Sequence, residues 1–482
     1  MRARQDVRLT GMAKVTIEVS EELAALILAA EAKLEEQAKA AKEFAALDID
    51  GTQAAIREAA NSVGKDMQRR WLQSLDTEEV SVVIDGRRCA KVGRYETTFR
   101  TLEGPVKITR SLYRERGVRN GPTMDVVSAR VGAVADGWLP EAAKAMAFLH
   151  QQAPSREAEA LAKQLHRLPY SRSSFERLGH VVGTLHSVVR DTVEDALMLK
   201  LKVPRKAMVV SISLDRVALP MEEPLPRPVG RPKKGAAKRP VARVFRMAYC
   251  ATITLLELGG DALYTIRYGR MPKADVPALC DSLAADVKLL LKKCPRLAVT
   301  VLTDGAPEMS QLLDGVINET TLGKPVHKTL DFWHLTEKLG RAAVVMRGAV
   351  KASSLIESWK LSLLNSSDAW QRILRQLRAS GLEHVRVADA RPVHDAITYL
   401  ENHAERLDYA EARRKGLPIG SGHVEATCKS LVGLRMKRPG ARWKEETGQH
   451  VLDLRALALS NRWNHALTLT LEPLRRPVSL AA

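Results

Sequence analysis

The order of strand-like and helix-like segments between residues 206 and 334 constrains the fold of this chain more than any other feature. Apolar runs rich in β-branched residues indicate strands, and longer runs with apolar residues three and four positions apart indicate helices. These segments are, in chain order, strands at 206–219, 241–258 and 261–270, a helix at 275–293, a strand at 296–305, a helix at 306–318 and a strand at 324–334. Consecutive strands favour antiparallel pairing, whereas strands joined through a helix favour parallel pairing.

This order predicts an α/β fold with a ribonuclease-H-like core, in which three antiparallel strands are extended by two parallel strands and helices cover the faces. The segments on either side of the core predict further domains. The predicted division is a helical N-terminal region at 1–78 that could dimerise, a small antiparallel sheet at 79–133, a helical region at 134–203 with a candidate helix-turn-helix, the first part of the core at 204–334, an inserted helical domain at 335–414, and a helix with a basic C-terminal region at 415–482.

The N-terminal part of the chain carries three local patterns. Heptad-like spacing in the first predicted helix suits either a dimerising helix pair or an amphipathic helix packed on its own domain. Turns at Asp85-Gly86 and Glu103-Gly104 predict β-hairpins. Two helical segments around residues 168–170 suit a helix-turn-helix and equally a structural helix pair. As a helix-turn-helix, the second helix would present Arg172 and Arg177 to DNA.

The charge balance indicates a nucleic-acid partner. The chain has 75 Lys and Arg against 56 Asp and Glu, a net charge of +19, and the surplus lies in runs. No apolar run approaches the ~18 residues of a membrane span, and the N-terminus lacks the apolar segment of a signal peptide. Five scattered cysteines without a Cys-x-x-Cys pair predict neither a disulfide framework nor a zinc ribbon, so we expect a cytoplasmic protein with no membrane partner.

Two aspartates follow predicted strands of the core. Asp215 follows the apolar run 209–214, and Asp304 follows the run that ends at Thr303. An isolated carboxylate is costly to bury but is tolerated at a strand end that faces a crevice. Each aspartate alone could merely cap the next turn. Together with a glutamate on a later helix they predict a divalent-cation site, because clustered carboxylates repel one another unless a cation neutralises them.

That glutamate is Glu425, the one acid among nine basic side chains between Arg413 and Lys444. It follows a Gly-Ser-Gly turn where a helix is predicted to begin. With Gly422 as the N-cap, Glu425 would occupy the capping-box position and have a structural role, whereas with Ser421 as the N-cap it misses that position by one residue. Inward packing of an apolar stripe on this helix would direct Glu425 to the crevice, which favours a metal ligand. The predicted stripe consists of Val424, Thr427, Cys428, Leu431 and Leu434.

Basic side chains around Glu425 and in one core loop are candidates for DNA contacts. Those after Glu425 are Lys429, Arg435, Lys437 and Arg442, with Trp443 as a candidate for stacking on a base or, more simply, for the core. The loop at 227–246 has eight cations and no acid, including Arg231, Lys233 and Lys234. It suits a flexible phosphate-binding loop or an arginine hook for a narrow minor groove.

Four stretches of the sequence together resemble the DDE transposases of bacterial insertion sequences, most closely the ISKra-type branch related to the Mutator-like group. They are SISLDRVALPM from Ser211, VLTDGAPEM from Val301, DFWHLTEKL from Asp331 and GLPIGSGHVEATCKSLVGLRMKRPGARW from Gly416. The resemblance extends from about Lys206 to the C-terminus. Relatives in this branch often carry a cysteine-rich zinc element upstream, where this chain has only Cys89, so another element must recognise the DNA ends.

The resemblance implies that Asp215, Asp304 and Glu425 form a catalytic, metal-binding triad, with Asp331 and His334 as a supporting pair. It implies two Mg²⁺ or Mn²⁺ ions that activate water and then a DNA 3′-hydroxyl. The implied partners are double-stranded DNA, at terminal inverted repeats and at a target, and further copies of the chain in a homodimer or larger oligomer near the bacterial nucleoid. A metal-dependent nuclease without strand transfer, and a host-adopted DNA-binding protein whose catalysis is dispensable, are the alternatives.

Overall fold

The computed structural model describes residues 19–226, 230 and 241–481, which form two compact units. The first unit holds the described residues up to Val182 and those from Thr468 onward, and the second holds Gly183–Leu467. Each unit combines helices with one five-stranded sheet, which confirms the predicted α/β class. Within the described ranges, no helix is long and apolar enough to cross a membrane.

The sheet of the first unit is antiparallel throughout and has the strand order β10-β1-β2-β3-β4. Its strands are β1 Ser81–Ile84, β2 Arg87–Arg100, β3 Pro105–Glu115, β4 Thr123–Asp125 and β10 Val478–Leu480. The predicted turn at Asp85 and Gly86 joins β1 to β2 with φ angles of 52° and 76°, the positive values that the tightest hairpins require. The sequence did not predict that β10 would pair with β1, because residues 79–133 and 415–482 were assigned to different domains.

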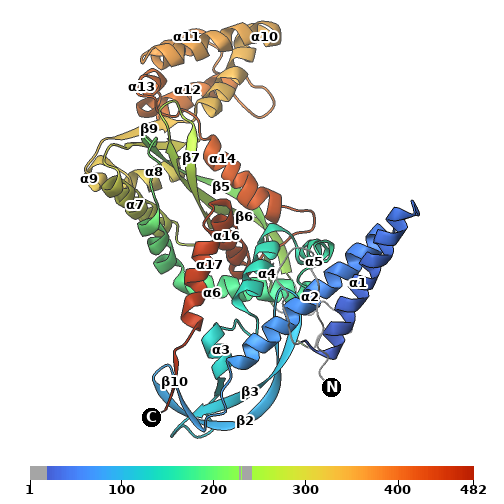
Figure 1. Cartoon of the computed structure of the whole chain (residues 1–482). Coiled ribbons are helices and arrows are strands. Elements are labelled where there is room, and N and C mark those ends of the chain that lie inside the picture. The colour runs from blue at the N-terminus through green and yellow to red at the C-terminus, as the bar shows by residue number, and fades with distance from the viewer. Residues whose placement is uncertain (1–18, 227–229, 231–240, 482) are drawn as a thin grey trace. The chain divides into compact units, whose positions relative to one another are not determined.

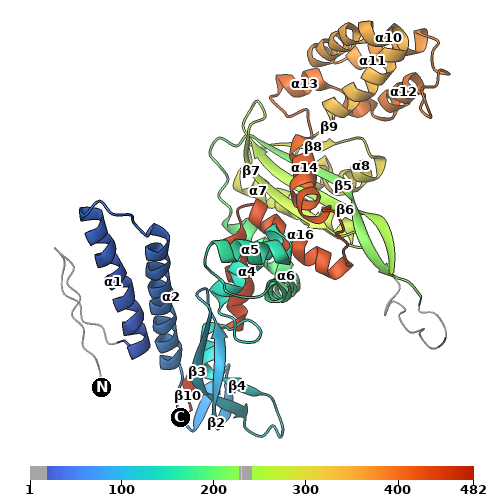
Figure 2. The same cartoon turned by 90° about the vertical axis from the view of Figure 1, so that its right-hand side faces the viewer.

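Helices complete the first unit. They are α1 Glu21–Lys42, α2 Ile49–Ser74, α3 Val126–Val131, α4 Pro140–Gln152 and α5 Ser155–Gln164, followed near the C-terminus by the 3₁₀ turn Glu472–Leu474. Two further helices, α6 Arg172–Lys200 and α17 Trp463–Leu471, run from one unit into the other. Figure 1 and Figure 2 show α1 and α2 side by side, and α2 packs Leu72 against the sheet. The packing of α1 on α2 of the same chain agrees with the amphipathic-helix alternative for the first helix, and dimerisation stays a prediction.

The sheet of the second unit has the strand order β7-β6-β5-β8-β9. Its strands are β5 Val209–Pro224, β6 Val241–Leu256, β7 Ala262–Arg270, β8 Ala298–Thr303 and β9 Val326–Leu330. The first three are antiparallel neighbours, and β8 and β9 extend the sheet in parallel from β5. Helix α7 Val276–Lys293 precedes β8, and α8 Pro307–Val316 with α9 Glu319–Leu322 precedes β9. The predicted order of three strands, helix, strand, helix and strand is therefore confirmed, with α9 as an addition.

Helices cover both faces of this second sheet (Figure 1). On one face, Leu283 of α7 and Leu313 of α8 pack in a core with Ile212 of β5. On the other face, α14 Gly422–Thr427 and α16 Glu445–Leu459 pack in a core with Leu219 and Met221, which have the opposite strand parity. Burial on both faces explains the long apolar runs that made these strands recognisable in the sequence.

The chain between β9 and α14 forms a helical segment with its own core. Its elements are α10 Phe332–Asn365, α11 Ala369–Ala379, α12 Pro392–Asn402, the 3₁₀ turn Ala404–Arg406 and α13 Tyr409–Arg414. Leu339, Ile373 and Leu400 are among the buried side chains that hold these helices together. The segment corresponds to the predicted helical domain at 335–414 and begins three residues earlier, since Asp331 caps α10.

Candidate functional site

Three aspartates lie in one row across the parallel strands of the second sheet. The last pair of β5 with β8 is Ile212 with Val301, so Asp215 and Asp304 each lie three residues beyond it. The pairing of β8 with β9 puts Asp304 beside Asp331, directly after the last pair of the two strands. Ligands of α/β sheets bind at the carboxyl ends of parallel strands, so this row is a candidate site.

Asp215 does not end its strand, and that part of the prediction is wrong. Strand β5 continues to Pro224 and pairs with β6 along its whole length. Its pairing with β8 stops at Ile212, so beyond that point β5 and β6 continue as a two-stranded arm. The arm is stable because Leu219 and Met221 are buried under the helices that follow Ser421.

Asp215 is half buried beneath the helical residues after Ser421. The Cys428 thiol donates to Asp215 Oδ2 at 3.4 Å, and the Arg216 main-chain N–H donates to Oδ1 at 2.6 Å. Burial raises the pKa of the Asp215 carboxyl, and the negative charges of Asp304 and Glu425 raise it further, against the lowering effect of the two hydrogen bonds. Asp304 and Glu425 therefore lie close enough to Asp215 for their charges to act on its carboxyl.

The helical segment holds the turn that carries Asp304. Gly305 has a φ of 90°, and a Cβ built on it would lie 2.5 Å from Tyr399 Oη, so a larger residue does not fit. Tyr399 Oη donates to the Asp304 main-chain oxygen at 2.7 Å, and His403 Nε2 lies 3.0 Å from the Gly305 main-chain oxygen. The sequence did not single out Tyr399 or His403, because their contacts with the turn at Asp304 join residues far apart in the chain.

Glu425 has no capping-box role. Helix α14 begins at Gly422 with Ser421 as its N-cap, which excludes the alternative in which Gly422 is the cap. The Ser421 hydroxyl instead donates to Glu425 Oε1 at 3.0 Å, and the Ser421 main-chain N–H donates to Asp331 Oδ2 at 2.5 Å. The Glu425 side chain is 50% exposed, so its carboxylate is oriented by Ser421 and still accessible.

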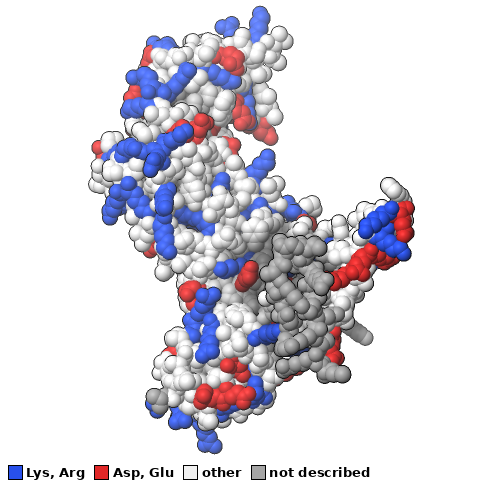
Figure 3. All heavy atoms as spheres, in the orientation of Figure 1, with Lys and Arg blue, Asp and Glu red and all other residues white. Residues whose placement is uncertain are grey.

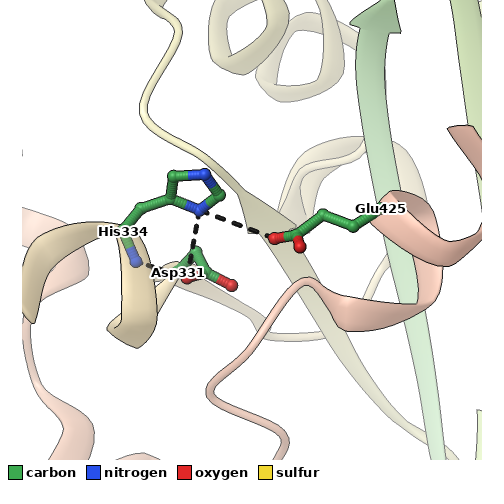
Figure 4. A group of neighbouring side chains, drawn as sticks. All are labelled: Asp331, His334 and Glu425. Carbon is green, nitrogen blue, oxygen red and sulfur yellow. Dashed lines mark hydrogen bonds and ion pairs between the residues drawn. The ribbon is translucent and has the colours of Figure 1, made fainter. Parts of the chain in front are cut away.

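Asp331, His334 and Glu425 converge, as Figure 4 shows. Asp331 Oδ1 accepts a hydrogen bond from the His334 main-chain N–H at 2.7 Å. The His334 ring atom Nδ1 lies 3.2 Å from Asp331 Oδ1 and 3.6 Å from Glu425 Oε1. Among the described residues, this is the one group of three or more His, Cys, Asp and Glu side chains found with ligand atoms all within 4.8 Å of one another.

The predicted triad and the predicted supporting pair thus meet at Glu425. Its charge acts on Asp215, while its Oε1 faces His334. The resemblance implied that Asp331 and His334 only support the triad. The structure gives this pair the tighter geometry with Glu425, whereas Asp304 joins the site through its position in the row and its charge.

The helix after Glu425 changes register, which corrects two predictions. A π-helical turn at Cys428–Gly433 precedes α15 Leu434–Met436, and such a turn shifts the following side chains around the helix axis. Leu434 is 59% exposed and Arg435 is 4% exposed. Leu434 is therefore not part of the inward stripe, and Arg435 takes the buried place instead of facing a phosphate.

Arg435 and Trp443 pack on each other. The guanidinium carbon of Arg435 lies 5.1 Å from the centroid of the Trp443 ring, and Trp443 Nε1 donates to the Met436 main-chain oxygen at 2.9 Å. This packing favours the core alternative for Trp443 over base stacking. Three predicted DNA contacts of the same region, Lys429, Lys437 and Arg442, are exposed.

Basic side chains occur on several elements of the second unit. On the face drawn in Figure 3, Lys and Arg side chains stand over the helical segment and next to the sheet, with acidic side chains between them. Arg231, Lys233 and Lys234 lie outside the described residues, so the loop and minor-groove alternatives at 227–246 stay predictions.

The candidate helix pair of the first unit is α5 followed by α6. Arg172 is exposed at the start of α6, as predicted for a DNA contact. Arg177 Nη1 lies 2.6 Å from Asp136 Oδ2, an ion pair that offsets part of its charge. A role in DNA recognition stays a prediction for both side chains.

No family model matches this chain, and no significant match is found among curated proteins. The functional argument therefore rests on the geometry and chemistry of the site.

Proposed function

We propose that this chain is a DNA transposase that binds the ends of an insertion sequence, cleaves them and joins them to target DNA. The observation that carries the proposal is the placement of Asp215 on β5 and of Asp304 directly after the neighbouring strand β8, with Glu425 near enough that its charge and that of Asp304 add to burial in raising the pKa of Asp215. Ionised carboxylates that repel one another bind divalent cations well, because the cation removes the repulsion.

The fold of the second unit supports the same proposal. Three antiparallel strands followed by two parallel strands, with helices on both faces, are what a ribonuclease-H-like core requires. In such a sheet the first strand and the fourth lie side by side, as β5 and β8 do here. We infer that Asp215 and Asp304 on these strands, with Glu425 after the inserted helical segment, supply the three acids of the mechanism.

The donor set fits Mg²⁺ or Mn²⁺, since both prefer carboxylate oxygen. Bound at Asp215, Asp304 and Glu425, two such ions would activate a water or a DNA 3′-hydroxyl and stabilise the leaving oxygen. The chain's own contribution is to orient the carboxylates. The Ser421 hydroxyl donates to Glu425 and the Cys428 thiol donates to Asp215. Hydrogen bonds from neighbouring side chains therefore orient two of the three acids.

The DNA would lie along the segment that follows Glu425. Lys429 and Lys437 are exposed there, and exposed cations bind the phosphate backbone irrespective of sequence. Trp333 is 63% exposed beside His334 and offers an aromatic face for an unpaired base. The partners we infer are duplex DNA at the element's ends and at the target.

A strand-transfer assay tests the proposal. The substrate is a duplex with a free 3′-hydroxyl end, built from the DNA sequences on either side of the gene, and the target is a supercoiled plasmid with Mg²⁺ present. The wild-type protein should join the two, and Glu425→Ala should reduce joining to background while DNA binding is retained. Glu337→Ala, an exposed glutamate on α10, is the matched control and should remain active.

The other possible results of this assay have distinct meanings. Full strand transfer by Glu425→Ala would contradict the assignment of this residue. Cleavage by the wild-type protein without joining would identify a metal-dependent nuclease. Specific DNA binding with neither reaction would favour the host-adopted DNA-binding protein.

A further inference from the structure

We infer that Asp331, His334 and Glu425 form a binding site for a divalent transition-metal ion that accepts imidazole nitrogen, with Zn²⁺ as the best-fitting ion. The site shares only Glu425 with the carboxylates of the proposed reaction. The inference concerns ion binding by the protein alone, so it goes beyond the proposed function and does not depend on it.

The spacing of the three ligand atoms fits one ion. The two nitrogen–oxygen separations are 3.2 Å, from His334 Nδ1 to Asp331 Oδ1, and 3.6 Å, from His334 Nδ1 to Glu425 Oε1. A tetrahedral Zn²⁺ with bonds of about 2.0–2.2 Å separates its ligand atoms by about 3.3–3.6 Å. The two separations from His334 lie within about 0.1 Å of that range, and all three ligand atoms lie within 4.8 Å of one another.

The imidazole nitrogen of this group is a second, independent indication. His334 Nδ1 is shielded from solvent and has no hydrogen-bond partner within the described part of the chain. It nevertheless points at the two carboxylate oxygens (Figure 4). A polar nitrogen shielded from solvent is nearly always satisfied, and this one faces two anionic oxygens without a hydrogen bond to either, which a bound cation or a protonated imidazole would explain.

The surroundings hold the ligands in place. Asp331 is fully buried, and its two oxygens accept hydrogen bonds from the main-chain N–H groups of His334 and Ser421. The Ser421 hydroxyl also donates to Glu425, so one residue orients both carboxylates. Hydrogen bonds of this kind to metal ligands fix their direction and stabilise their charged form.

The ligand set selects the class of ion. One imidazole nitrogen with two carboxylate oxygens suits Zn²⁺ and its neighbours in the first transition row, whereas Mg²⁺ and Ca²⁺ favour oxygen alone. Glu425 is 50% exposed and His334 is 39% exposed, so solvent can reach the group and water can complete the coordination. The competing explanation is an ion pair between the imidazole and the carboxylates, which needs no metal.

Cobalt absorption tests the inference directly. The full-length protein is freed of metal with a chelator and titrated with Co²⁺, a coloured substitute for Zn²⁺, and Zn²⁺ is then added as a competitor. The wild-type protein should bind one Co²⁺ with visible bands that Zn²⁺ removes. His334→Ala and Glu425→Gln should bind it at least about tenfold more weakly, the loss expected even from disturbing a metal ligand's surroundings.

Two kinds of control make the result decisive. His384→Ala removes an exposed histidine of the same helical segment and should leave the cobalt spectrum unchanged. Asp304→Asn should also retain the spectrum, although it should abolish strand transfer, which separates this inference from the proposed function. Absence of stoichiometric Co²⁺ binding by the wild-type protein, or an unchanged affinity in His334→Ala, would overturn the inference in favour of the ion pair.

Discussion

Replacing Lys429 and Lys437 together by glutamine should reduce the salt dependence of DNA binding. Both side chains are exposed and follow Glu425 along the same helical stretch, so DNA at the proposed carboxylates would bring its phosphates to them. A lysine that neutralises a phosphate displaces a counterion, and the release of counterions is what makes binding weaken as salt rises. Glutamine keeps most of the length and polarity of lysine and removes its charge.

One phosphate contact for each of the two exposed lysines sets the size of the expected effect. Arg435, a third cation predicted for this surface, is 4% exposed and stacks on Trp443, so it is not included among the phosphate contacts. Each contact contributes about 0.9 to the slope of log affinity against log salt concentration, so the double variant should have a slope shallower by about 1.8. Between about 50 and 200 mM salt, the wild-type protein would lose about 12-fold more affinity than the variant. Fluorescence anisotropy with a labelled duplex measures both slopes.

Two exposed lysines on α7, Lys288 and Lys292, provide the matched control, since α7 covers the opposite face of the sheet. Their double replacement by glutamine should leave the slope unchanged. Arg435→Gln should lower the midpoint of thermal unfolding and also leave the slope unchanged. Equal slopes for the wild-type protein and the Lys429 and Lys437 variant, or an equal change in the α7 pair, would refute the idea that DNA follows this stretch.

Two further perturbations test buried groups of the second unit. Burial raises the pKa of Glu194 from 4.5 to about 7, so the ionised carboxylate reduces stability as the pH rises through this window. Glu194→Gln cannot ionise, and urea unfolding should show it more stable than the wild-type protein by about 3 kcal/mol at pH 8 and equally stable at pH 4. Tyr399→Phe removes the hydrogen bond to the Asp304 main-chain oxygen and should lower the free energy of unfolding by about 1 kcal/mol, with Tyr249→Phe as the control. An equal loss in both tyrosine variants would mean that this bond contributes nothing specific.

The sheet of the second unit was predictable because each of its strands is marked by a pattern within a short stretch of sequence. The central part of the sheet is buried on both faces, so its apolar runs stand out, and the helices between strands determine which pairs are parallel. The pairing of Val82 with Leu480 was not predictable in the same way. Strand β10 has three residues and joins a partner near the other end of the chain, and no pattern within so short a segment identifies its partner.

The error at Leu434 and Arg435 has a specific physical cause. The predicted stripe assumed 3.6 residues per turn throughout, whereas the π turn at Cys428–Gly433 takes in one additional residue. A single extra residue exchanges an exposed position for a buried one. Helical periodicity in a sequence cannot show such a turn, because the residues that form it are the same ones that continue an ordinary helix.

The geometry around Glu425 depends on a contact that no local pattern contains. The sequence shows that Asp331 precedes His334 by three residues, and the capping of α10 follows from that spacing. The approach of Glu425 to His334 depends on the bond from the Ser421 main-chain N–H to Asp331, which joins residues separated by the whole helical segment. Because one serine holds both carboxylates, Ser421→Ala should loosen Glu425 alone, whereas the main-chain bond to Asp331 should persist. Asp304 then distinguishes the two proposals for this site, because it is a ligand in the proposed carboxylate triad and is not a ligand in the group of Asp331, His334 and Glu425.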